Sequence, residues 1–518
     1  MLLRSLAALL GGVLLALAFE PVGLAVLIPL SVAVLVCCVH GQPARRAWLP
    51  TLLFGGAFCF VLMFWMRSVG PDAWLSLAAL ETAFFAPLGA ALAWLMRLRW
   101  WPLWTACAWV GVETIRGGWP VGGMPWGRLS YAVAGTPWAE ALPWLGFSGV
   151  SLLLAVSGTM LGWLVLGGWR RPRAALLALA AVLVPVTAAA VATYSTEPAG
   201  RTTVAVVQGN LPGTGNDLVA VHRDVTRNQV EATVALADRV SSGEVAAPDF
   251  VIWPENSTAV DPFLDPEANR GILEAVGAVG VPVLVGGIVD APDQDEVLNQ
   301  GIVWDPTTGG GDRYTKRHPV PFGEYIPWRD TVFKGNFGKL RLIPRDMAQG
   351  TRREPLRIGG VLVADAICFD VAYDDGIHDQ VARGGQLLTV QTSNASFMGT
   401  SQIEQQFEIT RLRAMETGRY VAVAAVNGVS GIIDPDGQVL ESAGARTQQV
   451  LVREVGLRAG LTPAVRMGSW PGRVCLALAL VALLFSARRP RRAATRRTAE
   501  QAGDTTPEPA RDAAGNPA

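Results

Sequence analysis

VLVADAICFDVAYDD, residues 361–375, is a run of β-branched and small apolar residues that reaches a cysteine and continues into acidic residues. Such a run predicts a buried strand that gives way to a loop at Cys368. The other five of the six cysteines lie in apolar segments of membrane-spanning length; they are Cys37, Cys38, Cys59, Cys107 and Cys475. Cys368 is therefore the one thiol that we expect in an aqueous domain, and the even cysteine count indicates no disulfide framework.

Two charged residues upstream also come at the ends of strand-like stretches. Glu255 lies near the end of DFVIWPEN (249–256), and Lys316 lies in RYTKRHPVPFGEY (313–325). A Glu, a Lys and a Cys at three strand ends favour covalent acyl chemistry by a thiolate. Taken singly, each has a plainer interpretation, as a turn residue, a solvated basic residue or a small buried hydrophobe. Their order and common placement favour the catalytic interpretation.

The surrounding residues 200–465 alternate between strand and helix patterns. We expect strands at 202–210, 249–256, 281–290, 297–305, 361–369, 386–394 and 420–428, with a hairpin at 430–440. We expect helices at 217–241, 266–279, 371–384 and 401–417, and a turn at PTTGGGD (306–312). This alternation predicts an α/β layered fold in which helices cover the faces of the sheets. Catalytic groups in such folds commonly lie on loops beyond the strand ends.

The composition is that of a membrane protein joined to a globular domain. The 518 residues are 51% hydrophobic and only 17% charged, and the apolar excess falls in 1–195 and 471–487. Because a span needs about 20 apolar residues, we expect about eight transmembrane helices, seven of them in the first region, at 5–19, 22–39, 48–66, 73–96, 102–116, 145–167, 174–194 and 471–487. Residues 488–518 are predicted to be a basic and then disordered cytoplasmic tail.

Arginine clusters give these spans an orientation. The clusters fall in alternate loops and after the last span; they are Arg4, Arg45, Arg46, Arg97, Arg99, Arg170, Arg171, Arg173, Arg488, Arg489, Arg491 and Arg492. Eight spans put every cluster on one side, which the positive-inside rule identifies as cytoplasmic. The first segment is interpreted as a retained helix, because it lacks a small-residue cleavage site and continues directly into further spans. Residues 200–465 are therefore predicted to be extracytoplasmic at the cell membrane.

Several other chemistries find no support in the residues. The four histidines show no metal-ligand spacing, so neither a metal site nor a cofactor is expected. There is no GxSxG elbow and no glycine-rich phosphate loop after a strand. The net charge is zero, which gives no electrostatic case for nucleic acid. A Cys–His dyad that uses His318 or His378 stays open.

These motifs, in their order, resemble the nitrilase superfamily and, more closely, the apolipoprotein N-acyltransferase family. The resemblance covers about residues 1–487, and its markers are ETIRGGWPVGGMPWGRLSY (113–131), VVQGN (206–210), WPEN (253–256), YTKRHPVPFGEY (314–325), ICFD (367–370) and RAMETGRYVAVAAVNGVSGIIDPDG (413–437). It implies a nitrilase-like αββα sandwich that eight spans hold outside the membrane. It also implies a phospholipid as acyl donor, a cysteine thioester, and lipidated apolipoproteins whose N-terminal amine accepts the acyl chain.

The resemblance assigns roles to particular residues. It implies that Glu255 is the general base, Lys316 the cation on the oxyanion side and Cys368 the nucleophile. Three further residues have supporting positions: Glu324 beside the lysine, Phe369 as the family's aromatic residue next to the nucleophile, and Asp370 where some members have a glutamate. The family's usual NDAWFG block is TSNASFMG (392–399) here, which bears on substrate preference more than on the core chemistry.

Two rival functions stay open at this point. One is a nitrilase-type amidase tethered to a membrane, although one span would be enough for a tether. The other is a non-catalytic membrane scaffold, for example for a glycosyltransferase, although a scaffold needs no Glu–Lys–Cys set. Residues 328–344 mix aromatic and basic residues, so they are either an interfacial flap or an ordinary surface loop.

Overall fold

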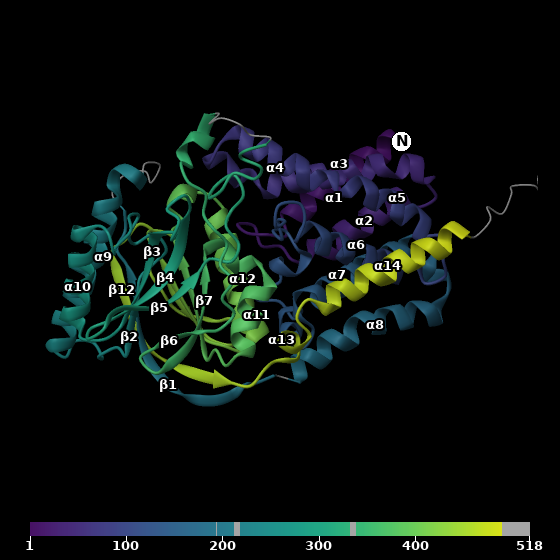
Figure 1. Cartoon of the computed structure of the whole chain (residues 1–518). Coiled ribbons are helices and arrows are strands. Elements are labelled where there is room, and N and C mark those ends of the chain that lie inside the picture. The colour runs from purple at the N-terminus through teal and green to yellow at the C-terminus, as the bar shows by residue number, and fades with distance from the viewer. Residues whose placement is uncertain (193, 212–217, 332–337, 489–518) are drawn as a thin grey trace, which may run out of the picture.

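The computed structural model describes residues 1–192, 194–211, 218–331 and 338–488, which form a helical half and an α/β half (Figure 1). The predicted tail from residue 489 onward lies outside the described residues. So does the middle of the segment at 328–344, and with it the question whether that segment is a flap. At its described start, the side chain of Trp328 is 55% exposed.

The α/β half contains two six-stranded sheets. The first has the order β12-β1-β2-β3-β4-β5, with β12 Gln449–Ala459, β1 Glu197–Gln208, β2 Phe250–Ile252, β3 Val283–Asp290, β4 Val297–Asp305 and β5 Gly309–Thr315. The second has the order β11-β10-β9-β8-β7-β6, with β11 Val439–Ser442, β10 Gly431–Ile433, β9 Val421–Ala425, β8 Leu387–Thr392, β7 Val361–Ile367 and β6 Leu356–Ile358. The central pairs β1–β2–β3 and β7–β8–β9 are parallel, as expected for strands joined by helices.

Helices cover the outer face of each sheet. α9 Leu218–Ser241 and α10 Pro266–Val279 pack on the first sheet, and α11 Asp374–Ala382 and α12 Gln402–Thr417 pack on the second. Strand β1 has apolar side chains on both faces, which is why both faces are covered. Val204 and Val206 belong to the core between the sheets, whereas Ala205 and Val207 belong to the core under α9 and α10. Successive side chains of a strand point to opposite faces. The predicted αββα sandwich is confirmed.

One local prediction in this half is wrong. The stretch PTTGGGD was expected to be a turn throughout, but the turn occupies only residues 306–308 and the glycines begin strand β5. Strand β5 forms because its backbone pairs with β4 from Gln300 to Asp305. The pairing of neighbouring backbones thus overrides the low strand preference of glycine.

The helical half contains a helix at every predicted apolar segment. These helices are α1 Leu2–Ala16, α2 Leu27–Val39, α3 Ala44–Leu62, α4 Pro71–Ala83, α5 Phe85–Leu95, α6 Trp101–Arg116, α7 Leu142–Val165, α8 Pro172–Val191 and α14 Trp470–Arg488. Within the described residues, three helical segments are long and apolar enough to cross a membrane, at Pro71–Leu95, Ala139–Val165 and Trp470–Arg488. The apolar helices α1 and α2 are shorter. The number of eight spans therefore stays a prediction.

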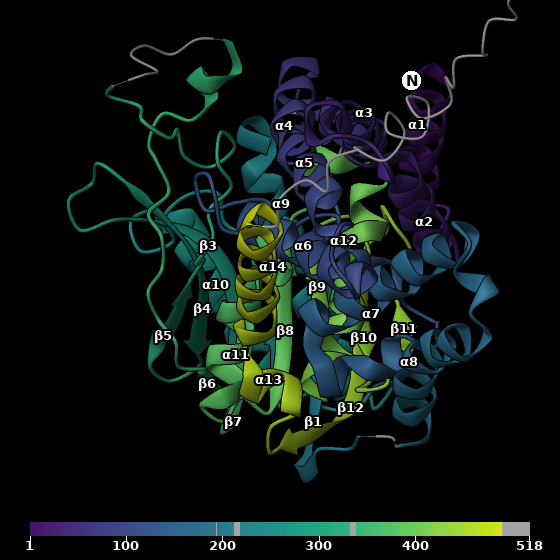
Figure 2. The ribbon, with the colours of Figure 1, turned by 90° about the vertical axis from the view of Figure 1, so that its right-hand side faces the viewer.

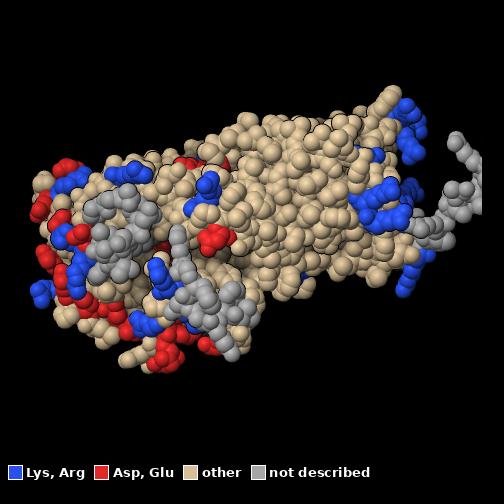
Figure 3. All heavy atoms as spheres, turned by 90° about the horizontal axis from the view of Figure 1, so that it is seen from above, with Lys and Arg blue, Asp and Glu red and all other residues tan. Residues whose placement is uncertain are grey.

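The basic ends of these helices lie together. Arg4 at the start of α1 donates to the carbonyl oxygens of Cys38 and His40 at the end of α2, at 3.1 and 2.9 Å. Ser486 near the end of α14 donates to the carbonyl of Trp94 near the end of α5, at 2.7 Å. On the face seen in Figure 3, Lys and Arg gather at the far end of the helical half, and a broad band with few charged side chains lies between them and the α/β half.

Two strands carry the chain between the halves. β1 leaves α8 and β12 returns to α13 Pro463–Met467 and α14, and the two strands pair antiparallel from Glu197↔Ala459 to Gln208↔Gln449. α14 then packs along α6 (Figure 2). The halves also meet directly, because α12 of the sandwich packs against α7. Of the three predicted catalytic residues, Cys368 follows β7 of the second sheet, whose helix α12 meets the helical half, whereas Glu255 and Lys316 follow strands of the first sheet.

Candidate active site

The three predicted catalytic residues each follow a strand. Glu255 comes three residues after β2, Lys316 comes directly after β5, and Cys368 comes directly after β7. The first of these loops needs a glycine beside it, because a Cβ on Gly286 of β3 would lie 2.2 Å from the carbonyl oxygen of Pro254. The sheets bring the three strand ends together at one place, although the residues are far apart in the chain.

Glu255 and Lys316 form a buried ion pair. The Lys316 Nζ donates to Glu255 Oε1 at 3.1 Å, and the two side chains are 1% and 3% exposed. Glu255 Oε1 also accepts from Asn299 Nδ2 at 2.8 Å, and Oε2 accepts from the backbone N–H of Ser393 at 3.0 Å. Each carboxylate oxygen can accept about two hydrogen bonds. One acceptor position therefore remains on Oε2, and it is available for a proton.

Glu324 holds the lysine from the other side. The Lys316 Nζ donates to Glu324 Oε1 at 2.6 Å, and Glu324 Oε2 accepts from the backbone of Val320 at 2.8 Å. Burial disfavours the charged ammonium, but the carboxylates of Glu255 and Glu324 outweigh burial and hold the pKa of Lys316 well above its usual range. Lys316 is therefore charged at every physiological pH. Its position beside both glutamates fits the predicted support by Glu324.

The thiol of Cys368 lies within the field of these charges. Burial, and after it the charge of Glu255, raises the pKa of the Cys368 thiol to about 12, against the opposing charge of Lys316. At pH 7 such a thiol is ionised in only about one molecule in 10⁵. The resting group is thus a thiol, and it needs a base at the moment of attack. Glu255 has an open acceptor position and its charge acts on the thiol, so it is the candidate for that base.

The backbone at Cys368 is unusual for a residue with a side chain. Its φ is +50°, at the start of a 3-10 turn that spans Cys368–Ala372. Such left-handed conformations cluster at functional sites. The thiol points toward α12, where Gln406 Oε1 lies 3.9 Å from Sγ. The Gln406 amide is held in turn by Gln402 Nε2 at 2.6 Å and by the Thr392 hydroxyl at 3.1 Å.

Asp370 ties the lysine segment to this turn. Its carboxylate accepts from the backbone of His318 at 2.8 Å, from the backbone of Arg317 at 3.3 Å and from the Tyr314 hydroxyl at 2.9 Å. Burial works against ionisation of Asp370, yet the hydrogen bonds from His318 hold its pKa below the usual value. Asp370 makes these bonds to the neighbours of Lys316 and so sets the course of the backbone around it.

Within the described residues both candidate histidines lie against carboxylates, and the partner of the Cys368 thiol is Gln406. His318 lies 3.0 Å from Asp370 and stacks on Tyr373 at 3.7 Å; burial lowers its pKa, but the hydrogen bonds to Asp370 and Asp375 prevail and raise that pKa to about 9. A histidine that is protonated at neutral pH cannot serve as a base. His378 is buried with its Nε2 3.1 Å from Glu416. Within the described residues no group of three or more His, Cys, Asp or Glu side chains is arranged to hold a metal ion.

Several residues of the site had no place in the sequence-based prediction. Asn299 on β4 and Gln406 on α12 contact Glu255 and Cys368, and their only signal was an amide in an otherwise apolar strand or a run of glutamines in a helix. Phe369 was predicted, but its partner was not: it stacks on Trp126 of the helical half, with ring centroids 6.3 Å apart.

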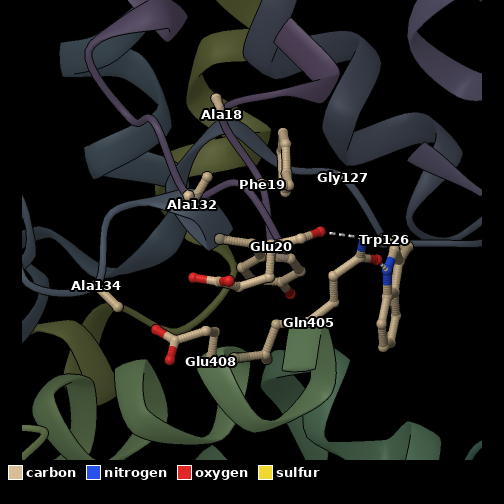
Figure 4. Close-up of a pocket in the computed structure, with 12 residues that line it drawn as sticks. Ala18, Phe19, Glu20, Trp126, Gly127, Ala132, Ala134, Gln405 and Glu408 are labelled. Atoms are coloured by element: carbon tan, nitrogen blue, oxygen red, sulfur yellow. Dashed lines mark hydrogen bonds between the residues drawn. The ribbon is translucent and has the colours of Figure 1, made fainter. Parts of the chain in front are cut away.

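Gln405 joins α12 to the helical half at the same junction. Its Oε1 accepts from the indoles of Trp126 and Trp65 at 2.8 and 3.1 Å, and its Nε2 donates to the carbonyl of Glu20 at 2.8 Å (Figure 4). A cavity of about 20 Å³ lies beside it, bounded also by Glu408. That volume holds little more than one water molecule.

Comparisons with known proteins divide the chain in the same way. Residues 11–160 match the model of the apolipoprotein N-acyltransferase N-terminal domain, and residues 203–459 match that of carbon-nitrogen hydrolases. The chain is 34% identical over 474 residues to the apolipoprotein N-acyltransferase of Mycolicibacterium smegmatis, covering 86% of this chain and 79% of that one. It is 31% identical over 515 residues to that of Methylococcus capsulatus, covering 93% and 96%. A solved amidase from Nesterenkonia sp. is 15% identical with a TM-score of 0.34, covering 52% of this chain and 94% of that one.

Proposed function

The chain belongs to the apolipoprotein N-acyltransferase family, and from this membership we propose that it transfers an acyl chain from a phospholipid, through a thioester on Cys368, to the N-terminal amine of lipidated apolipoproteins. One observation carries the mechanism: the buried ion pair of Glu255 and Lys316 lies next to a thiol that is protonated at rest. These are a base, a cation and a nucleophile in one place.

The first half-reaction forms the thioester. Glu255 takes the thiol proton on Oε2 while the Cys368 sulfur attacks the ester carbonyl carbon of the phospholipid. The negative charge that develops on the carbonyl oxygen is stabilised by the Lys316 ammonium. When the tetrahedral intermediate collapses, the ester C–O bond breaks and Glu255 returns the proton to the leaving oxygen. A lysophospholipid departs and the acyl chain stays on sulfur.

The second half-reaction transfers the acyl chain to nitrogen. The acceptor amine attacks the thioester carbonyl, and Glu255 removes a proton from that nitrogen as the bond forms. Lys316 again faces the oxyanion. Collapse breaks the C–S bond, and the proton on Glu255 returns to the sulfur of Cys368. The site is then restored to its resting state with an amide as the product.

The helical half has a chemical reason to adjoin the site. We infer that it spans the membrane about eight times and holds the sandwich on the extracytoplasmic side, an arrangement that the shared end of the basic clusters and the band with few charged side chains support. The stacking of Phe369 on Trp126 puts the nucleophile turn at the junction of the halves. A site beside the lipid receives acyl chains laterally and limits hydrolysis of the thioester.

The two rival functions are less well supported. A tethered amidase would not need residues 11–160 to resemble the N-terminal domain of apolipoprotein N-acyltransferases. The relatives whose alignments cover 86% and 93% of this chain are named as apolipoprotein N-acyltransferases. A non-catalytic scaffold has no need of a buried Glu255–Lys316 pair beside a cysteine, since burying such charges is costly without a function for them.

Intact-mass spectrometry tests the proposal. The purified full-length protein is incubated with phospholipid and should gain the mass of one acyl group, which peptide mapping should place on Cys368. A diacylated lipopeptide with a free N-terminal amine should then discharge the adduct and gain an amide. Cys368→Ala should show neither event. Hydrolysis of simple amides without any N-acylation would favour the tethered amidase instead.

A further inference from the structure

The turn that carries Cys368 is held on its outer side by the loop between α6 and α7, which belongs to the helical half. The Tyr131 hydroxyl of that loop donates to the carbonyl of Ala372 at 2.5 Å, and the Tyr373 hydroxyl donates back to the carbonyl of Gly123 at 2.8 Å. Both bonds are buried. The two segments are about 250 residues apart in the chain, so this contact exists only through the packing of the halves.

A partly buried ion pair reinforces the contact. One nitrogen of Arg128 donates to both oxygens of Asp374, at 2.9 and 3.0 Å, and the two side chains are 11% and 13% exposed. Arg413 of α12 donates to the same carboxylate at 2.9 Å and to the carbonyl of Val371 at 2.8 Å. Burial opposes the charge on Asp374, yet Arg128 and Arg413 hold its pKa far below the usual range. The pair therefore stays charged throughout the working pH range.

The turn that carries Cys368 begins with an unfavourable backbone conformation. It is a five-residue 3-10 turn whose first residue has a φ of +50°, a conformation that costs about 1–3 kcal/mol for a residue with a side chain. Surrounding contacts must over-determine such a backbone. On its inner side Asp370 supplies them, and on its outer side the α6–α7 loop does.

We infer that Arg128 is a positioning residue for the nucleophile: by holding Asp374, it keeps the Cys368 turn where Glu255 and Lys316 can act on the thiol. The helical half would then set the geometry of the reacting sulfur in addition to holding the sandwich at the lipid. This role deepens the proposed function and rests on it for the transfer step. The state of the thiol can be measured without any substrate.

Loss of the Arg128–Asp374 pair should speed alkylation of Cys368 and slow acyl transfer. The charged groups that act on the thiol are Glu255, Lys316 and Glu324, and burial is the main reason for its high pKa. A loosened turn moves the sulfur toward solvent, so its pKa falls from about 12 toward the ordinary value of about 8.5. Alkylation at a fixed pH becomes faster, while acyl transfer becomes slower, because a nucleophile about 1 Å out of place loses about 10²-fold in rate.

The test uses the full-length protein in lipid nanodiscs and the variant Arg128→Met. Alkylation of Cys368 by iodoacetamide is followed peptide by peptide at about pH 9, well below the pKa of about 12. The alkylation rate of Cys368 should rise by about 10-fold or more, the change that a pKa lower by about one unit gives, and thioester formation should slow by about 10- to 100-fold with little change in KM. Arg128→Lys should recover most of both effects, because a single nitrogen of Arg128 makes both contacts with Asp374.

Internal and external controls separate a local shift from unfolding. The buried cysteines Cys38, Cys59, Cys107 and Cys475 should stay protected in every variant that keeps its fold. Arg201→Met removes an ion pair of the same type with Glu454, in which both side chains are more than half exposed, and should change neither readout.

The outcomes decide the inference either way. A Cys368 alkylation rate in Arg128→Met equal to that of the wild type would overturn it, whatever happens to thioester formation. If that variant exposes the buried cysteines as well, Tyr131→Phe decides, because it removes only the hydroxyl on Ala372. A smaller rise in alkylation rate, confined to Cys368, supports the inference, and an unchanged rate overturns it. Failure of the proposed acyltransferase function is recognised separately, by a wild-type protein that alkylates normally but never gains an acyl adduct.

Discussion

Among single substitutions in the site, Lys316→Met should lower the stability of the protein most, and the contacts of Lys316 give the size of the loss. The substitution removes the ammonium between Glu255 and Glu324, with contacts of 3.1 and 2.6 Å, and leaves two carboxylates that are 3% and 16% exposed without their shared cation. Breaking a buried pair in this way costs about 3–5 kcal/mol. For a domain of this size each kcal/mol lowers Tm by about 2–4 °C, so we expect a loss of about 6–20 °C at pH 7.

The loss should depend on pH with a definite sign. Burial already raises the pKa of Glu324, and Lys316 opposes that rise, so the substitution raises this pKa further. A carboxyl whose folded pKa lies above its unfolded value adds stability below the unfolded pKa, and this stability is lost as the pH rises through the folded pKa. Lys316→Met should therefore gain more stability between pH 8 and pH 5 than the wild type does, because its Glu324 pKa is raised further.

Differential scanning fluorimetry at the two pH values measures this effect. Thioester formation, followed by intact mass, should fall by about 10²- to 10³-fold because the oxyanion loses its cation. Lys316→Arg should rescue poorly, since a planar guanidinium does not fit a space shaped for a compact ammonium. Arg201→Met serves as the control for loss of an exposed ion pair. A Tm at pH 7 within 2 °C of the wild type, with no larger gain at pH 5 than the wild type shows, would refute the reasoning, since it rests on about 3–5 kcal/mol for the buried pair.

Three further predictions follow from the same geometry. Cys368→Ala should abolish both the acyl adduct and transfer while leaving Tm within a few degrees, and an adduct mapped to another residue would contradict its role. Glu255→Gln should block thioester formation and also the discharge of a preformed thioester, because an amide cannot take a proton in either step; normal single-turnover discharge would count against it. A membrane-impermeant amine reagent should modify Lys334 or Lys339 on intact cells, since Lys316, the third of three lysines, is buried; labelling only after lysis would reverse the topology.

Much of the fold could be predicted because its signals are local. Helix α10 begins at Pro266 after the capping residue Asp265 and has the predicted bounds, and β4 has the predicted bounds of an apolar run between turns. The break between α4 and α5 was missed although the sequence carries a signal for it: Pro87 has no N–H to bond to the carbonyl of Ala83, where α4 ends. Strand β5 was missed because it depends on pairing with β4, which no local pattern encodes.

The sequence by itself determined which residues could be catalytic and which strand each of them follows. Glu255, Lys316 and Cys368 could be selected because each follows its own strand, and a strand end can be recognised locally. Only the tertiary structure decided what surrounds them. Glu255 and Lys316 are 61 positions apart in the chain, and Arg128 and Asp374 are 246 positions apart; the packing of the sheets and of the two halves brings each pair together. Periodicity reports which face of an element is buried, and it carries no information about which distant side chain that face will meet.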